Sequence, residues 1–262
     1  MTPSRFSRAF SVVVVIAVFL VTWPRGPALA LNPGYVALGD SIEAGYGATN
    51  PDADGWVSLF WAYLKAPDIL GSNTDLMNLG TPDATVRDIQ LGELVPALAA
   101  IVTHAPVVVS WGGGGNDLLD FIRSPQAATC LRGNVSCLTR LNSLLNEVQQ
   151  TIDLTVKELR ASGASDAKIL LRTQYDPFLK RGCDPTGTRA ALAAVVLEGE
   201  APPFLTRGLN DRIRDVATKY GARVIEIYQV FATMADAYIA ADCIHPSDRG
   251  HRAIADAAQL AF

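Results

Sequence analysis

The chain has 262 residues, which is the length of one sizeable globular domain, and no change in composition along it marks a second. Hydrophobic residues make up 49% and charged residues 18%, which excludes an intrinsically disordered chain. The formal net charge of −4, without a cluster of Lys and Arg, argues against nucleic acid as a partner.

The first 30 residues have the pattern of a secretory signal peptide. Arg5 and Arg8 precede an apolar run over residues 10–21, and a small-x-small cleavage site ends at Ala30. The run is shorter than the roughly 20 residues that a membrane span needs. We therefore expect cleavage after Ala30 and a secreted or extracytoplasmic mature domain, residues 31–262, without stable membrane insertion. An uncleaved N-terminal anchor is the alternative.

Apolar runs typical of strands alternate with helical patterns along this domain. The strand-like runs cover residues 35–38, 76–79, 107–111, 169–172 and 223–228, and the clearest helical patterns cover residues 56–65, 138–161, 209–220 and 247–260. Strands that alternate with helices form parallel sheets with helices on both faces. The sequence therefore predicts an α/β fold, a three-layer α/β/α sandwich around a mostly parallel five-stranded sheet.

Polar residues of chemical interest follow the carboxyl ends of the predicted strands. Ser41 follows the first strand, Gly80 ends the second and Asn116 follows the third, while Asp242 and His245 precede the last helix. Open α/β sheets bind their ligands at this edge. We therefore expect these five residues to lie close together.

Ser41, His245 and Asp242 are the three groups that acyl transfer by a serine requires. The reaction needs a hydroxyl, a base that takes its proton, and a carboxylate that orients the base. Asp242 stands three residues before His245, a spacing that places a carboxylate against the imidazole. The other histidines suit the role of base less well, because His104 approaches the third strand from the opposite edge and His251 lies within the last helix. Ser41 alone would be read as a turn or a helix cap.

Donors for a developing oxyanion are also present. The N–H groups of Ser41 and Gly80 and the side-chain amide of Asn116 are candidates. The four glycines at residues 112–115 instead suggest a phosphate-binding loop, but the lysine of a Walker motif and the spacing of a dinucleotide fingerprint are both missing. We therefore expect neither nucleotide nor any other cofactor.

The four cysteines, Cys130, Cys137, Cys183 and Cys243, all lie in the predicted mature domain. An even number in an oxidising compartment favours two disulfides, for which three pairings exist. Short separation favours Cys130–Cys137 and leaves Cys183–Cys243, which would stiffen the turn beside Asp242. No CxxC pair occurs, so a metal site is not expected.

Residues 176–206 follow the fourth predicted strand and form the least regular stretch of the chain. They are rich in Pro and Gly but contain an apolar run over residues 190–197. Either this stretch overhangs the ligand-binding edge as a lid or pocket wall, or it is an ordinary surface excursion.

Four short motifs together resemble those of the GDSL-type, or SGNH, hydrolases. They are Gly39-Asp40-Ser41, Asn78-Leu79-Gly80, Gly115-Asn116-Asp117 and Asp242-Cys243-Ile244-His245-Pro246. The order and approximate spacing are those of the family, over nearly the whole mature domain, as in secreted bacterial members. The resemblance implies a flavodoxin-like sandwich, Ser41 as nucleophile, His245 as base and Asp242 as its orienting acid. It also implies an oxyanion hole made by Ser41, Gly80 and Asn116.

The activity expected from these observations is that of a secreted serine esterase. It would hydrolyse short- to medium-chain acyl esters or lipids through an acyl-serine, without metal or organic cofactor. Tyr46, Trp56 and the apolar run at 190–197 favour acyl chains, although aromatic residues also stack on sugars. A carbohydrate O-deacetylase of the same fold and a non-catalytic exported protein that binds a glycan or lipid are the alternatives. The sequence leaves the oligomeric state open.

Overall fold

The computed structural model describes residues 31–162, 167–199 and 205–262. The predicted signal peptide and its cleavage site lie outside these residues. The elements in chain order are β1 (Gly34–Gly39), α1 (Pro51–Asp54), α2 (Trp56–Leu64), β2 (Asp75–Asn78), α3 (Val86–Asp88), the π-helix η1 (Ile89–Glu93), α4 (Leu94–Ile101), β3 (Val107–Gly112), α5 (Gly115–Arg123), the 3₁₀-helix η2 (Ala127–Arg132), α6 (Val135–Ala161), β4 (Lys168–Arg172), the 3₁₀-helix η4 (Pro177–Leu179), α7 (Thr188–Glu198), α8 (Leu209–Tyr220), β5 (Arg223–Ile225), α9 (Tyr228–Tyr238) and α10 (Asp248–Ala261).

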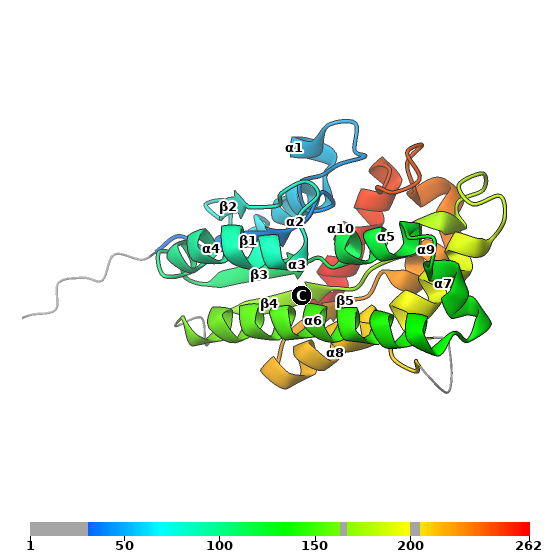
Figure 1. Cartoon of the computed structure of the whole chain (residues 1–262). Helices are drawn as coiled ribbons and strands as arrows, with labels where there is room; N and C mark the ends of the chain where they lie inside the picture. The colour runs from blue at the N-terminus through cyan, green and yellow to red at the C-terminus, as the bar shows by residue number, and fades with distance from the viewer. Residues whose placement is uncertain (1–30, 163–166, 200–204) are drawn as a thin grey trace, which may run out of the picture. The chain divides into compact units, whose positions relative to one another are not determined.

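The five strands form one parallel sheet in the order β2-β1-β3-β4-β5, with helices on both faces (Figure 1). The predicted three-layer α/β sandwich is confirmed. After β2 on one side of β1, the chain crosses to β3 on the other side. The crevice between the carboxyl ends of β1 and β3 is therefore the topological switch point, where folds with this strand order bind their ligands.

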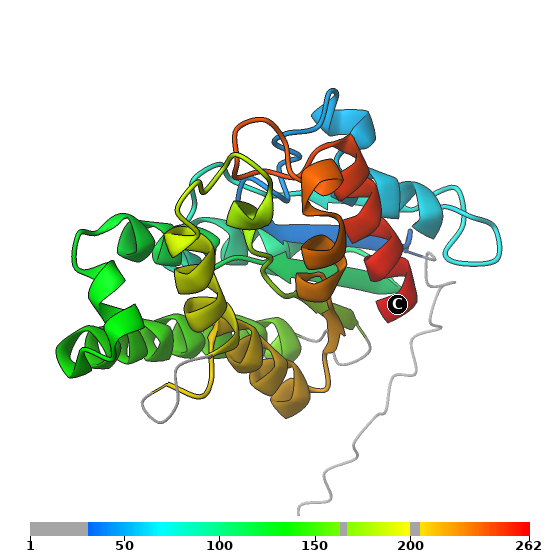
Figure 2. The same ribbon diagram turned by 90° about the vertical axis from the view of Figure 1, so that its right-hand side faces the viewer.

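Alternate residues of the central strands belong to two separate cores. Val36 and Leu38 of β1 pack with α4, α6 and α8 on one face, whereas Tyr35 and Ala37 pack with α2, α9 and α10 on the other. In Figure 2, α10 and α9 lie in front of the sheet. Because β1 and β3 are buried on both faces, their sequences are almost entirely apolar, and the polar Ser110 of β3 is hydrogen-bonded to the Tyr35 hydroxyl.

The prediction for the fifth strand was too long. Instead of running to residue 228, β5 ends at Ile225, and α9 begins at Tyr228. The first helical hydrogen bond of this turn runs from the Phe231 N–H to the carbonyl oxygen of Ile227, and both side chains are completely buried. The apolar pattern therefore continues through a change from strand to helix, which an apolar run alone does not reveal.

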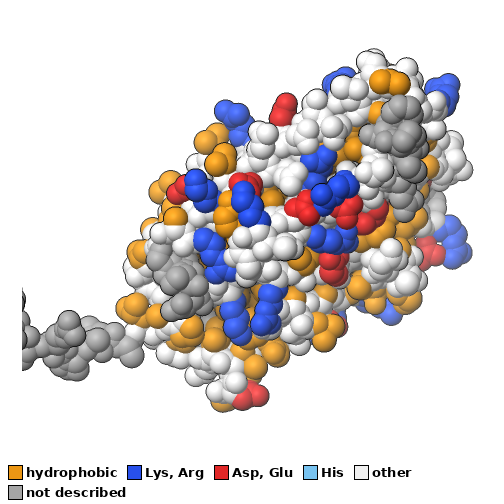
Figure 3. Space-filling model, turned by 90° about the horizontal axis from the view of Figure 1, so that it is seen from below, with side chains coloured by type: hydrophobic (Ala, Val, Ile, Leu, Met, Phe, Trp, Pro, Cys, Tyr) orange, Lys and Arg blue, Asp and Glu red, His pale blue; other side chains and the backbone are white. Residues whose placement is uncertain are grey.

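Basic and acidic side chains lie side by side on the face that carries α8 (Figure 3). Arg214 is paired with Glu226 at 2.7 Å, and Lys219 with Asp153 at 2.6 Å. Exposed pairs of this kind each stabilise a fold by at most about 1 kcal/mol. In the described part of the chain, no helix combines the length and the apolar character that a membrane crossing needs.

Candidate active site

Ser41, His245 and Asp242 form one hydrogen-bonded chain at the carboxyl edge of the sheet. Ser41 lies in the turn that follows β1 and is 6% exposed. Its Oγ lies 2.9 Å from Nε2 of His245, and Nδ1 of the same ring lies 2.6 Å from Oδ2 of Asp242. The structure thus brings together three residues that the sequence analysis selected from opposite ends of the chain.

The turn that carries His245 is organised by the Asp242 carboxylate. Its Oδ1 accepts the N–H groups of Ile244 and His245, each at 3.0 Å. Partial burial opposes ionisation of Asp242, but these N–H groups and the imidazole outweigh it and lower its pKa. Asp242 is therefore a carboxylate near neutral pH. It orients the proton on Nδ1 towards itself and leaves Nε2 to accept the Ser41 hydroxyl.

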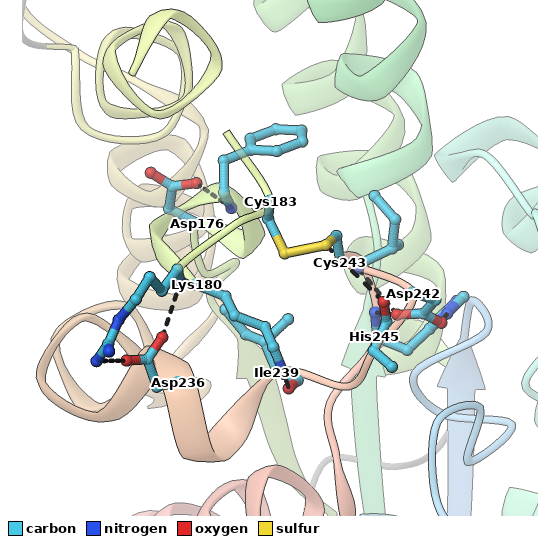
Figure 4. The surroundings of a disulfide bond; sticks show 12 residues. Asp176, Lys180, Cys183, Asp236, Ile239, Asp242, Cys243 and His245 are labelled. Carbon is cyan, nitrogen blue, oxygen red and sulfur yellow. Dashed lines mark hydrogen bonds and ion pairs between the residues drawn. A yellow bond between two sulfur atoms is a disulfide. The ribbon is translucent and has the colours of Figure 1, made fainter. Parts of the chain in front are cut away.

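A disulfide between Cys183 and Cys243 joins this turn to the segment after η4. Cys243 has a φ of 62°, a left-handed conformation that is uncommon for residues other than glycine. Figure 4 shows the bridge between the His245 turn and the segment of Lys180, whose Nζ donates to the Ile239 carbonyl oxygen. The structure also contains the second bridge that short separation favoured, Cys130–Cys137.

Buried charged side chains lie behind the nucleophile turn. Arg172, the last residue of β4, holds the Glu43 carboxylate through Nε at 2.7 Å and Nη2 at 3.0 Å, and Asp40 lies 3.8 Å away. Burial alone would lower the pKa of Arg172, but the Glu43 and Asp40 carboxyls together raise it. Burial and then the charge of Glu43 raise the pKa of Asp40 to about 8. The cluster therefore keeps its cation on Arg172, while burial beside Glu43 disfavours ionisation of Asp40.

Glu93 supports the same turn from the opposite side. It ends the π-helix η1, and its Oε2 accepts the Gly39 N–H at 2.8 Å. The residue is 4% exposed, and burial raises its pKa to about 7. A π-bulge often marks a functional site, and here it places a carboxyl group against the strand end that precedes Ser41.

The three predicted oxyanion donors differ in what they contact. Among the described residues, the Ser41 N–H has no acceptor. Asn116, in the first turn of α5, donates one Nδ2 hydrogen to the Ala84 carbonyl oxygen at 3.0 Å and retains another. The Gly80 N–H already donates to Oδ1 of Asn78 at 3.1 Å, so it must share or leave that bond to bind a ligand.

An apolar cavity that is partly open to solvent, with about 550 Å³ of space including that open part, lies beside Ser41 and Asn116. Its apolar walls come from α5, η4, α7 and the His245 turn, through Leu118, Leu119, Ile122, Pro177, Phe178, Ala193, Leu197 and Ile244. The irregular stretch at 176–206 therefore supplies a pocket wall, which decides between the two alternatives left open for its described part.

The remaining two histidines lie apart from this chemistry. His104 lies 3.4 Å from Asp75, near the amino end of β2. His251 is completely buried, accepts the Trp56 N–H on Nδ1 and contacts the Tyr46 carbonyl oxygen through Nε2 at 2.8 Å. Burial lowers the pKa of His251, so it remains a neutral packing residue. Within the described ranges, no three His, Cys, Asp or Glu side chains are grouped to hold a metal ion.

The family model of the GDSL-like lipase/acylhydrolase family matches residues 37–253. The chain belongs to this family. The resemblance inferred from the four motifs is thereby confirmed, and membership supports ester hydrolysis as the activity of this GDSL-family chain. Among curated proteins, no sequence matches it.

Solved structures share the fold at low sequence identity. The lipase Lip_vut3 from a goat rumen metagenome has a TM-score of 0.64 and 19% identity, over 88% of this chain and 97% of that one. An extracellular lipase from Streptomyces rimosus has a TM-score of 0.58 and 19% identity, over 88% and 100%. A two-domain esterase (CEX) active on acetylated mannans has a TM-score of 0.53 and 17% identity, over 88% and 48%.

Sequence reasoning did not find three residues that hold the site together. Glu43 and Arg172 form the buried ion pair behind Ser41, and Tyr175 donates its hydroxyl to the Ile244 carbonyl oxygen at 2.6 Å. One signal was available, because Arg172 is a charged residue that directly follows the apolar residues 169–171 of an inner strand. A charge at such a position is rarely buried unless it is paired.

Proposed function

We propose that this GDSL-family chain is an exported serine esterase that hydrolyses short- to medium-chain carboxylic esters or lipids through an acyl-serine intermediate. The observation that carries the proposal is the hydrogen-bonded chain from Ser41 through His245 to Asp242, which opens onto an apolar cavity. This is the arrangement of nucleophile, base and orienting acid used in acyl transfer by serine.

In the acylation step, Nε2 of His245 takes the Ser41 hydroxyl proton while Oγ attacks the ester carbonyl carbon. The carbonyl oxygen becomes an oxyanion, which the Ser41 N–H and the Asn116 amide stabilise, joined by the Gly80 N–H once it turns from Asn78. The ester C–O bond then breaks, and His245 returns the proton to the departing alcohol. Asp242 stabilises the imidazolium that forms between these two transfers.

In the deacylation step, water replaces the alcohol. His245 takes a proton from the water as its oxygen attacks the acyl-serine carbon, and the same donors hold the second oxyanion. The Ser41–acyl bond breaks, His245 returns the proton to Ser41 Oγ, and the carboxylic acid leaves.

The cavity lining supports acyl chains longer than acetyl. Leu118 and Ile122 of α5 and Leu197 of α7 offer an acyl chain hydrocarbon contacts beside Ser41. An acetyl group would leave most of this apolar surface without a partner. The carbohydrate O-deacetylase is therefore less well supported, and the hydrogen-bonded Ser41, His245 and Asp242 argue against a non-catalytic binding protein. The first experiment separates both from the esterase.

Export is supported by two observations. The arginines and apolar run of residues 1–30 have the pattern of a signal peptide that ends at Ala30. Both disulfides lie in residues 31–262, which we propose as the mature hydrolase domain, and disulfides persist in oxidising compartments.

Hydrolysis of p-nitrophenyl esters from acetate to palmitate tests the proposal, with the wild-type mature domain and a folded Ser41→Ala variant. We expect turnover that loses on the order of 10⁶-fold in the variant. The optimum should lie at a short- to medium-chain ester. Turnover of acetate alone would favour the deacetylase, and no turnover by the folded protein would favour the binding protein. Activity retained by Ser41→Ala would refute the assignment.

A further inference from the structure

The buried pair of Glu43 and Arg172 contacts the turn that carries Ser41. Glu43 Oε2 accepts the Asp40 N–H at 3.2 Å, and the same oxygen accepts Nη2 of Arg172 at 3.0 Å. The peptide between Gly39 and Asp40, one residue before Ser41, is therefore held against the end of β4. Both charged side chains are 0% exposed.

The same pair is connected to the loop that carries Gly80. The main-chain carbonyl oxygen of Glu43 accepts Nδ2 of Asn78 at 2.8 Å, while Oδ1 of Asn78 accepts the Gly80 N–H. Gly80 packs so closely on this turn that a Cβ there would lie 2.6 Å from the Ala44 nitrogen. The position of the Gly80 loop therefore follows that of Glu43.

A third connection reaches the loop before Asn116. Nη1 of Arg172 donates to Oε1 of Gln174 at 3.2 Å, and Nε2 of Gln174 donates to the Gly113 carbonyl oxygen at 2.8 Å. Gly113 lies between β3 and the first turn of α5, where Asn116 stands. The Ser41 and Asn116 segments are thus hydrogen-bonded, directly or through Gln174, to the charged groups of the pair, and the Gly80 segment is bonded through Asn78 to the main chain of Glu43.

The space around the pair leaves little freedom for it to shift. A Cβ at Gly112 would lie 2.2 Å from Oε1 of Glu43 and 2.7 Å from Nε of Arg172, and one at Gly39 would lie 2.4 Å from Oε2 of Glu43. The strand ends of β1 and β3 therefore close directly on the two side chains. A buried ion pair is often no more stabilising than apolar residues of the same volume. Fold stability therefore does not explain why two charged residues occupy this position.

We propose that the Glu43–Arg172 pair positions the oxyanion donors, by fixing the Ser41, Gly80 and Asn116 segments relative to one another. The proposal rests on the proposed esterase function and extends it to two residues that do not touch the reacting atoms. Displacement of such donors by about 1 Å lowers a rate by roughly 10²-fold. The loss should affect the transition state and spare binding of the substrate.

The test compares Glu43→Gln, Arg172→Lys and the double variant Glu43→Gln/Arg172→Met with the wild-type enzyme. The readouts are kcat and KM for p-nitrophenyl butyrate and the inhibition constant of an alkyl trifluoromethyl ketone, which adds to the serine and forms an oxyanion. Arg160→Met is the matched control. Arg160 also bonds main-chain carbonyl oxygens, those of Tyr220, Ala167 and Gly221, but it does so at the opposite end of β4.

We expect each single variant to lose about 10²-fold in kcat with KM within about threefold of wild type. The inhibition constant of the ketone should rise by the same factor as kcat falls. Arg160→Met should lose thermal stability and keep its kcat. If a single variant does not fold, the double variant tests the positioning role in its place, because replacing both charges by neutral groups avoids an unpaired buried charge.

A folded Glu43→Gln or double variant whose kcat and ketone affinity match wild type would overturn the positioning role. A rise in KM together with a fall in kcat, at unchanged affinity for the ketone, would also overturn it, because this combination indicates altered substrate binding. A wild-type enzyme without Ser41-dependent turnover would refute the proposed function instead, so the two failures are distinguishable.

Discussion

Replacing Ala193 by leucine should shorten the acyl chain that the enzyme accepts. Ala193 is the smaller of the two side chains that α7 contributes to the cavity beside Ser41. Burial of one methylene stabilises a complex by about 0.8 kcal/mol, or about fourfold in kcat/KM. Three added carbons displace about three methylenes of substrate, so an ester that fills the cavity should lose about 2.4 kcal/mol, or roughly sixtyfold.

The assay is kcat/KM for p-nitrophenyl acetate, butyrate, octanoate and decanoate. Acetate, which is too short to reach the new side chain, should change by less than about twofold. Ala191→Leu is the control, because Ala191 is exposed on the same helix and does not line the cavity. Overpacking costs about 1–3 kcal/mol of stability, which thermal unfolding will register and which affects all esters alike. An unchanged ratio of decanoate to acetate would refute the placement of the acyl chain.

Three further predictions concern stability and the oxyanion hole. Burial raises the pKa of Glu93 from 4.5 to about 7. Between these pH values the folded protein keeps a proton on Glu93 that the unfolded chain releases, so Tm should fall as pH rises. The fall should be less steep in Glu93→Gln, and an equal dependence of Tm on pH in the two proteins would contradict this. The Cys183→Ser/Cys243→Ser variant should show a clear fall in kcat with only a small fall in Tm, since the His245 turn is freed. A lower Tm with unchanged kcat would contradict this role of the disulfide. Asn116→Ala should lower kcat by about 10²–10³-fold with little change in KM, and a rise in KM alone would exclude its role.

The architecture and the central residues of the site follow from local patterns combined with one rule of topology. Ser41 and His245 are 204 residues apart, yet Ser41 directly follows β1 and His245 lies in the turn between α9 and α10, and the two meet at the carboxyl edge of the sheet. The Asp242 carboxylate is found by its spacing from His245, because three residues within one turn suffice for the contact. The disulfide pairs follow from sequence separation alone.

The residues behind the site depend on packing that no local pattern contains. Glu43 and Arg172 are 129 residues apart, and their contact needs the space that is left at the ends of β1 and β3 because Gly39 and Gly112 have no side chains. The state of the Gly80 N–H was likewise not predictable, since its bond to Asn78 depends on the conformation of one turn. The end of β5 was missed because the apolar pattern continues into α9.

Labelling of the mature domain with a fluorophosphonate, followed by mass spectrometry of its peptides, tests the central claim most directly. The proposed chemistry predicts a single covalent adduct on Ser41, no adduct in Ser41→Ala, and much slower labelling when His245 is replaced by alanine. An adduct on another residue, or ester turnover by a protein that the probe does not label, would contradict the assignment of Ser41 as the nucleophile.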